Sequence, residues 1–159
     1  MKRPASKTVP QSHVEMTELV LPNDTNPLGN LLGGRLMHWI DIAAATAAAR
    51  HTHRVCVTAS VDELNFLYPI KLGEAVILHA SVNRVFNTSL EIGVRVSKQN
   101  LLTGETRHTN TAYLTFVALD EAGKPVQTYP VAPRTKDERR RYRDAARRRQ
   151  HRLQHRKHF

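Results

Sequence analysis

The chain of 159 residues has a single cysteine, Cys56, so no disulfide can form within it. Valines flank this cysteine on both sides, which favours a small buried thiol over a nucleophile or a metal ligand. No hydrophobic run approaches the ~20 residues that a membrane-spanning helix needs. The basic N-terminal stretch is not followed by a hydrophobic segment, so it does not match a secretory signal. These absences predict a cytoplasmic protein of about one domain.

Positive charge is plentiful, but it is concentrated at one end of the sequence. The formal net charge is +10, and residues 134–159 hold 12 Lys or Arg against 3 Asp or Glu. The rest of the chain has 12 basic and 11 acidic residues and is therefore nearly neutral. The basic segment contains no Gly or Pro, so its composition favours a helix. The basic character thus belongs to a tail and not to the body of the protein.

Hydrophobic periodicity predicts one long helix and several strands. Residues 35–50 lack Gly and Pro and carry Ala, Leu, Ile and Met at helical spacing. Alternating apolar and polar residues predict strands, the second of which extends to a stop at Pro69. These strands are expected near residues 12–21, 55–69, 76–86, 90–96 and 109–118. We predict disorder for residues 1–11, a folded domain at 12–130 and a basic extension at 131–159.

The order of these elements predicts an α+β fold in which an antiparallel sheet wraps around one long central helix. The connections between the four long strands are short, and short connections join antiparallel neighbours. A single buried helix cannot be covered by loops alone, so the sheet has to curl around it. Such a sheet leaves an exposed edge and a helix face without cover, which predicts self-association.

A Gly pair and one carboxylate distinguish the segment around the predicted helix. Turn-forming residues precede Gly33 and Gly34, which lead into the helix. Backbone N–H groups are unpaired at a helix N-terminus and can bind a phosphate or a polarised carbonyl. Asp41 lies between two isoleucines within the helix, where an unpaired carboxylate is costly. From the helix alone, a structural role and a functional role for Asp41 are equally good interpretations.

The segment PNDTNPLGNLLGGRLMHWID resembles the opening motif of the bacterial acyl-CoA thioesterases of short and broad specificity, whose relatives include the brain-type cytosolic acyl-CoA hydrolases. The segments TASVDELNFLYPIKLGE and RVFNTSLE are similar to the same family, and the resemblance extends from about Met16 to Pro130. It implies a hotdog fold and the hydrolysis of fatty acyl-CoA to free fatty acid and CoA. It also implies a homo-oligomer, with the dimer as the minimal active unit and a trimer of dimers as the full assembly.

The resemblance further implies the residues of the active site. Its catalytic pair matches Asn30 and Asp41, which face each other from different subunits in related enzymes. Asp41 would then act as general base or nucleophile, while Asn30 orients water or the substrate carbonyl. The N–H groups of Gly33 and Gly34 would hold the developing oxyanion. The resemblance places Asn87, Thr88 and Ser89 near the nucleotide or the pantetheine arm, and Asn65 and Phe66 near the acyl-pantetheine tunnel. No metal and no cofactor are expected, because CoA is part of the substrate.

The five substrate contacts also have plain structural interpretations. Asn87 to Ser89 fit a hairpin turn, Phe66 fits the core, and Asn65 fits the cap of a strand edge. The tail likewise fits a solvated or partly docked helix, since Tyr142 and Leu153 belong to a sparse apolar stripe. As a functional alternative, it forms an electrostatic patch for CoA phosphates, an anionic membrane or nucleic acid.

Two rival functions accompany the thioesterase hypothesis. The first is an acyl-CoA sensor with the same fold that binds its ligand without hydrolysis, against which the pairing of Asp41 with Asn30 argues. The second is nucleic-acid binding through the tail. That function is disfavoured, because the sequence has no helix-turn-helix, zinc-finger or RNA-recognition motif, and only Tyr142 interleaves the basic residues with an aromatic ring.

Overall fold

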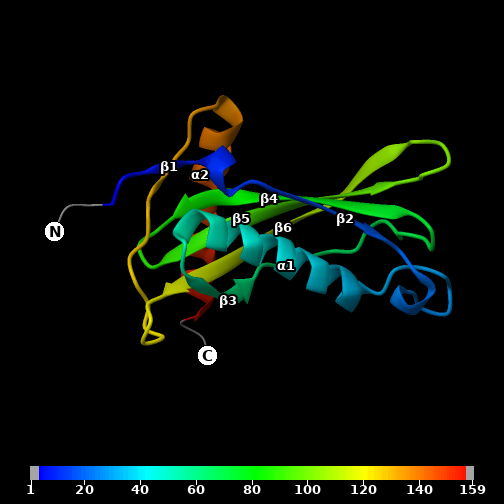
Figure 1. Ribbon diagram of the computed structural model, residues 1–159, viewed down its shortest axis with the longest axis horizontal. Coiled ribbons are helices and arrows are strands. Elements are labelled where there is room, and N and C mark those ends of the chain that lie inside the picture. Colours follow the sequence, from blue (N-terminus) through cyan, green and yellow to red (C-terminus); the bar gives the residue numbers. More distant parts are fainter. Residues whose placement is uncertain (1–3, 157–159) are drawn as a thin grey trace.

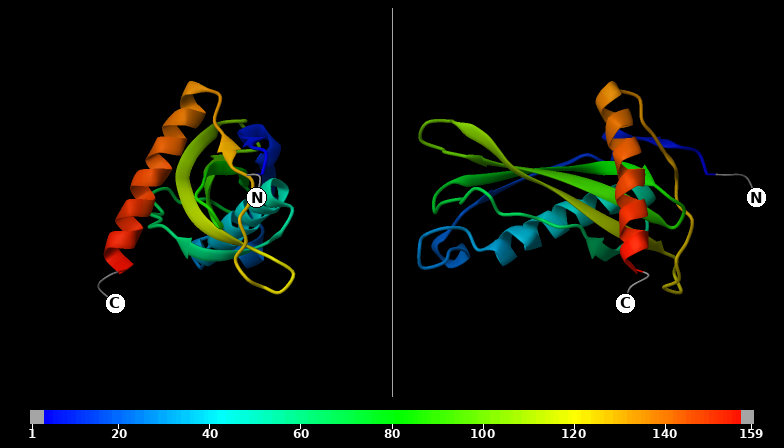
Figure 2. Two further views of the ribbon diagram at one scale, coloured as in Figure 1. Left: turned by 90° about the vertical axis from the view of Figure 1, so that its left-hand side faces the viewer. Right: turned by 180° about the vertical axis from the view of Figure 1, so that it is seen from behind.

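The computed structural model describes residues 4–156, in which a curled antiparallel sheet encloses one long helix (Figure 1). A second long helix crosses the outside of the sheet (Figure 2). In chain order the elements are β1 (Lys7–Thr8), η1 (Val9–Ser12), β2 (Val14–Leu19), η2 (Pro22–Asp24), α1 (Gly33–Thr52), β3 (Val55–Val61), β4 (Ala75–Val85), β5 (Ser89–Gln99), β6 (Thr106–Leu119), β7 (Val131–Ala132) and α2 (Lys136–Arg156).

The main sheet has the strand order β2-β4-β5-β6-β3, and every neighbouring pair in it is antiparallel. The long central strands are joined by hairpins, so β4, β5 and β6 follow one another both in sequence and in space. Strands β2 and β3 form the two edges. The predicted α+β architecture, with the sheet wrapped around the central helix, is confirmed.

The core lies between α1 and the concave face of the sheet. The inward side chains of the central strands are buried and alternate with outward ones, as a sheet packed on one face requires. The helix contributes Ile40 and four alanines that are completely inaccessible to solvent. Alanine at these positions allows the helix backbone to lie close to the strands. The fully buried alanines are Ala43, Ala44, Ala47 and Ala48.

The bounds of helix α1 lie close to those that the sequence predicts. It starts at Gly33, two residues before the predicted start, and it ends at Thr52. His53 then adopts a left-handed conformation with φ of 52°, and its N–H donates to the carbonyl of Ala49. This arrangement is a common way to terminate a helix, although glycine is the usual residue there.

Two sequence expectations differ from the structure. Residues 1–11 were expected to be disordered, but Lys7–Thr8 pairs in parallel with Val131–Ala132 and Val9 is buried. Residues 1–3 lie outside the described range. The second strand was expected to reach Pro69, but β3 ends at Val61 and an irregular segment follows. In that segment, backbone groups bond to side chains in place of a neighbouring strand. For example, the Asn65 carbonyl accepts a hydrogen bond from the Asn110 side chain.

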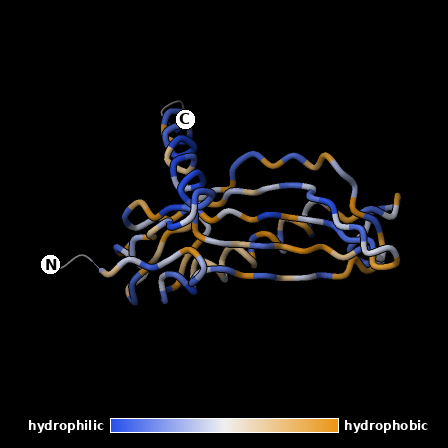
Figure 3. The backbone as a smooth tube through the Cα atoms, turned by 90° about the horizontal axis from the view of Figure 1, so that it is seen from above, coloured by the Kyte–Doolittle hydropathy of each residue, from blue (hydrophilic) through white to orange (hydrophobic). Residues whose placement is uncertain are grey.

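Helix α2 docks on the convex face of the sheet through arginines, although its sequence is strongly hydrophilic (Figure 3). Arg148 donates to the completely buried Glu91 on β5 at 2.7 Å and lies 3.6 Å from the centre of the Tyr113 ring. Arg152 donates to Asp62 at 2.9 Å. Although burial alone would lower it, the hydrogen bond and charge of Glu91 raise the pKa of Arg148. The structure thus contains a docked helix over Lys136–Arg156, and residues 157–159 lie outside the described range.

Replacing Glu91 by Gln is expected to destabilise the protein by about 2–4 kcal/mol, because the charges of Arg148 and Arg152 would lose their buried counterion. Urea unfolding at a fixed protein concentration would measure the change. Asp144→Asn is the matched control, since within residues 4–156 Asp144 pairs only with exposed arginines of the same helix. We expect that control to cost less than about 1 kcal/mol. Equal losses in the two variants would contradict a special role for Glu91 in holding α2.

Candidate active site

Asp41 lies half-buried in the middle of α1, beside β3. Its Oδ1 accepts a hydrogen bond of 2.8 Å from the hydroxyl of Thr58 on β3. Thr58 pairs with Phe116, a core residue, so this position of β3 faces the helix. No side chain or backbone group of residues 4–156 donates to the other carboxylate oxygen. One oxygen is therefore fixed in place, and the other is available for chemistry.

The N-terminus of α1 is open. Leu32 occupies the N-cap position, and no side chain in the described part of the chain caps the first N–H groups. A Cβ at Gly33 would lie 3.5 Å from the ring of Phe66, while a Cβ at Gly34 would meet nothing within 4 Å. Phe66 is half-exposed and therefore lies beside the uncapped N–H groups with part of its ring free. These groups carry the positive end of the helix dipole, which suits an oxyanion.

Asn30 lies in the loop before α1, and the loop is tied down on both sides. Asn26 closes it by accepting from the Asn30 N–H at 3.1 Å and donating its own N–H to the Asn30 carbonyl at 2.9 Å. The Asn30 backbone also pairs with Lys71 in an isolated β-bridge. Within the described range the Asn30 side chain makes no hydrogen bond. Its amide is therefore positioned by the backbone and free to meet a ligand.

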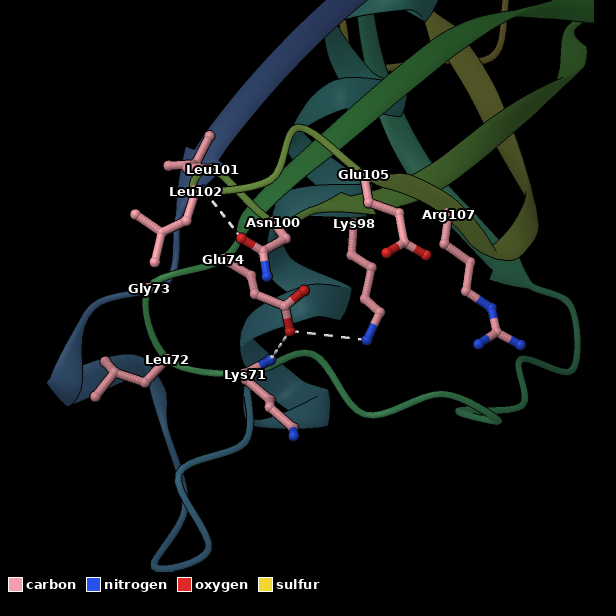
Figure 4. A pocket seen from close by; sticks show the side chains of 10 residues that line it. All are labelled: Lys71, Leu72, Gly73, Glu74, Lys98, Asn100, Leu101, Leu102, Glu105 and Arg107. Carbon is pink, nitrogen blue, oxygen red and sulfur yellow. Dashed lines mark hydrogen bonds and ion pairs between the residues drawn. The ribbon is translucent and has the colours of Figure 1, made fainter.

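The turn that holds Lys71 is itself fixed, as Figure 4 shows. Glu74 accepts from the Lys71 N–H at 2.9 Å and forms an ion pair with Lys98 at 3.7 Å. This turn and the hairpin around Leu102 line an open cavity of about 440 Å³. None of the predicted site residues lines this cavity.

One protomer does not bring Asn30 and Asp41 together. Asp41 is eight residues beyond Gly33 in α1, which corresponds to about 12 Å along the helix axis. Asn30 lies a further three residues before Gly33. The helix N-terminus, Phe66 and Asn30 therefore form one half of a site, and Asp41 with Thr58 forms the other.

The other residues predicted to contact substrate lie in two separate places. Asn65 precedes Phe66, but its side chain donates to Glu63 at 3.4 Å. Asn87 to Ser89 form the hairpin between β4 and β5, at the end of β4 remote from Lys71. The length of β4 separates them from the Asn30 loop by roughly 30 Å. Ser89 accepts a hydrogen bond from Arg149 of α2 at 3.2 Å, so this hairpin is associated with the tail.

Exposed apolar side chains lie on β3 and α1, the two elements that hold Thr58 and Asp41. Strand β3 is an edge, and Val55 on it is 70% exposed. Ile42, next to Asp41 on α1, is 42% exposed. An edge strand with exposed valines beside an exposed helix face is typical of a surface that pairs with another chain.

Sequence reasoning did not identify Thr58 as a site residue. The signal was available in principle, because Thr58 alternates with outward residues on β3 and so belongs to the face that meets the helix. What the sequence alone could not give is the position of β3 against α1, which brings the Thr58 hydroxyl within hydrogen-bond distance of Asp41.

Other reactive groups do not compete for the role. Burial raises the pKa of the Cys56 thiol, despite a hydrogen bond with Thr52, so the thiol stays protonated near neutral pH. Within residues 4–156, no cluster of three or more His, Cys, Asp or Glu side chains is arranged to hold a metal ion. Neither helix in that range has the length and apolar character required to cross a membrane.

Comparison with known proteins identifies the family. The model of the thioesterase superfamily matches residues 28–105, which include the Asn30 loop, Gly33, Asp41, Thr58 and Phe66. The acyl-CoA thioester hydrolase YkhA of Bacillus subtilis is 44% identical, over 87% of this chain and 80% of its own length. The chain belongs to the thioesterase superfamily. The resemblance noted in the sequence is confirmed.

Solved structures of other thioesterases share the whole fold. A hexameric acyl-CoA thioesterase aligns with a TM-score of 0.92 at 41% identity, covering 96% of this thioesterase and 97% of the other chain. An acyl-CoA hydrolase of Staphylococcus aureus in complex with butyryl-CoA and CoA aligns with a TM-score of 0.89 at 34% identity, covering 95% and 92%. These coverages leave too few residues to exclude α2, so the tail helix is part of the shared fold. The hotdog architecture is thereby confirmed.

Structures of the S. aureus enzyme also exist for three variants, in which an aspartate, an asparagine or a threonine is replaced by alanine. The replaced aspartate and threonine of that enzyme are 17 residues apart, as Asp41 and Thr58 are in this chain. Its replaced asparagine lies 15 residues before the aspartate, a spacing that Asn26 and not Asn30 has to Asp41.

Proposed function

We propose that this thioesterase hydrolyses acyl-CoA thioesters to CoA and the free acid. The observation that carries the proposal is the half-buried Asp41, held by Thr58 on one oxygen and free on the other. The uncapped helix N-terminus beside Phe66 supplies donors for the oxyanion that develops during attack on a thioester. An acyl-CoA sensor without catalysis would have no use for a carboxylate in that position.

In this mechanism the polar groups divide the work. Asp41 either takes a proton from the attacking water or attacks the carbonyl carbon itself, and both routes need the ionised carboxylate. Asn30 directs the water or the carbonyl oxygen through its free amide. The N–H groups of Gly33 and Gly34 stabilise the negative charge on that oxygen until the C–S bond breaks and CoA leaves as the thiolate. Thr58 keeps Asp41 in its orientation.

The active unit is a dimer, because the two halves of the site lie apart in one protomer. Pairing two β3 edges would cover the exposed valines and bring the open face of Asp41 against a second chain. Asn30, the Gly pair and Phe66 of one subunit would then meet Asp41 and Thr58 of the other. Three such dimers form the full assembly, in keeping with the hexameric relative.

We place the protein in the cytoplasm, in fatty acid metabolism, acting without metal or cofactor.

Release of free thiol from acyl-CoA tests the proposal. The purified protein is expected to release CoA from saturated acyl-CoA substrates, measured with a thiol reagent over a series of chain lengths. The rate should saturate with substrate and should not change when EDTA is added. Tight binding of acyl-CoA without thiol release at any chain length would instead support the sensor hypothesis.

A further inference from the structure

One side of α1 is not covered by the sheet, and His38 lies in the middle of it. The residues on this side follow the spacing of a single helix face: Gly34, His38, Asp41 and Ala45. The His38 side chain is exposed, and that of Asp41 is half-buried. On the opposite side of the helix, Ala43 is completely buried in the core. His38 therefore shares the open face of α1 with the proposed catalytic carboxylate.

The proposed dimer brings this face of α1 against the same face of a second copy. When Asp41 of one subunit meets Gly34 of the other, two-fold symmetry makes Gly34 of the first meet Asp41 of the second. The two helices then run in opposite directions, and the symmetry axis passes each helix halfway between these positions, at residues 37–38. Within one chain, Asp41 lies three residues beyond His38, a spacing at which Cβ atoms are about 5–6 Å apart. An imidazole thus lies within one helical turn of each carboxylate.

Thioester hydrolysis needs a proton carrier beside Asp41, because attack places a proton of water on the carboxylate and the departing sulfur needs one. Apart from Asp41, the first four turns of α1 hold two ionisable side chains, Arg35 and His38. Arg35 pairs with Asp24 at 3.1 Å, and a guanidinium group does not release its proton in proteins. On β3 the only ionisable side chain is Cys56, and burial raises the pKa of that thiol. In these two elements, His38 is thus the group that can both give and accept a proton near neutral pH.

We propose that His38 carries a proton to the leaving sulfur, an inference that rests on the proposed hydrolysis and the proposed dimer. As the oxygen of water bonds to the carbonyl carbon, Asp41 takes the proton of that water. The C–S bond then breaks with its electron pair on sulfur, and the imidazolium of His38 protonates this sulfur. The neutral imidazole next takes the proton held by Asp41, which restores both side chains, and the product acid ionises in solvent.

The same role for His38 applies if Asp41 attacks the carbonyl carbon itself. The C–S bond again breaks with its electron pair on sulfur, which takes the proton of the imidazolium. The neutral imidazole then accepts a proton from the water that releases the acyl group from Asp41. On either route His38 returns to its starting state.

Two thioesters of the same acid, with leaving groups of different basicity, test the role of His38. The thiolate of CoA is strongly basic and gains from protonation, whereas 4-nitrothiophenolate leaves without a proton. His38→Gln is expected to lower kcat for the acyl-CoA about a hundredfold, and kcat for the 4-nitrothiophenyl thioester by less than about threefold. The matched control is His13→Gln, which removes an exposed imidazole next to β2 and should match the wild type with both thioesters.

Rescue with free imidazole is a second measurement of the same role. His38→Ala should regain turnover of acyl-CoA as imidazole is added, whereas Asp41→Asn should not. Equal losses by His38→Gln with the two thioesters point to a structural role and would overturn the assignment. Unchanged turnover of acyl-CoA by His38→Gln, or no recovery of His38→Ala with imidazole, would overturn it as well. Failure of the proposed function would show instead as a wild type that releases thiol from neither thioester.

Discussion

Replacing Asp41 by Asn is expected to lower kcat by roughly a thousandfold or more, since the group that activates the nucleophile is lost. Asn keeps the shape of the side chain and can still receive the hydrogen bond from Thr58. Substrate binding should therefore change little, and KM should stay within a few-fold of the wild-type value. Steady-state thiol release with an acyl-CoA substrate would measure both constants.

The Asp41→Asn enzyme must also keep its fold and assembly for the result to bear on catalysis. Asp41 is half-buried, and the substitution removes a charge without removing volume, so melting temperature and hydrodynamic size should match the wild type. Glu121→Gln, a carboxylate change in an exposed turn, serves as the matched control and should retain full activity. Turnover by Asp41→Asn at more than about a tenth of the wild-type rate would remove Asp41 from the mechanism.

Features of this site that depend on neighbouring residues could be predicted from the sequence, whereas contacts between distant segments could not. The Gly pair and Asp41 were recognisable because turn chemistry and an odd carboxylate in an apolar helix are local signals. The contact of Phe66 with Gly33 and that of Thr58 with Asp41 depend on how separate strands align with α1. Such register is set by packing of the whole core, and no short segment encodes it.

The tail illustrates the same limit. Its composition predicted a basic helix, and the helix is there. Its docking depends on Glu91, which in the sequence is an ordinary polar residue of an alternating strand on the outward face. Only when β5 is placed beneath α2 does that carboxylate become the buried partner of Arg148. The N-terminal strand is similar, because β1 is ordered by β7, a partner near the other end of the chain.

Mixing two inactive variants is expected to restore activity, if the site is shared between subunits. Asp41→Asn retains Asn30, and Asn30→Ala retains Asp41, so a dimer of one chain of each kind has one complete site and one doubly altered site. With random pairing of equal amounts, half of the dimers are mixed and about a quarter of all sites are complete. Thiol release by the coexpressed mixture, without separation of the dimers, would measure the recovery, and different tags on the two chains would verify that they are present in equal amounts.

A site formed within a single chain could not produce this recovery of activity. If Asn30 and Asp41 of the same chain acted together, every site in a mixed dimer would still carry one substitution, and activity would stay at the level of the separate variants. A second control, coexpression of Asp41→Asn with Thr58→Ala, places both changes in the same half of the site. That mixture should show no complementation, because each site of a mixed dimer takes Asp41 and Thr58 from one chain. Recovery to about a quarter in the first mixture and none in the second would assign the site to facing halves of two subunits.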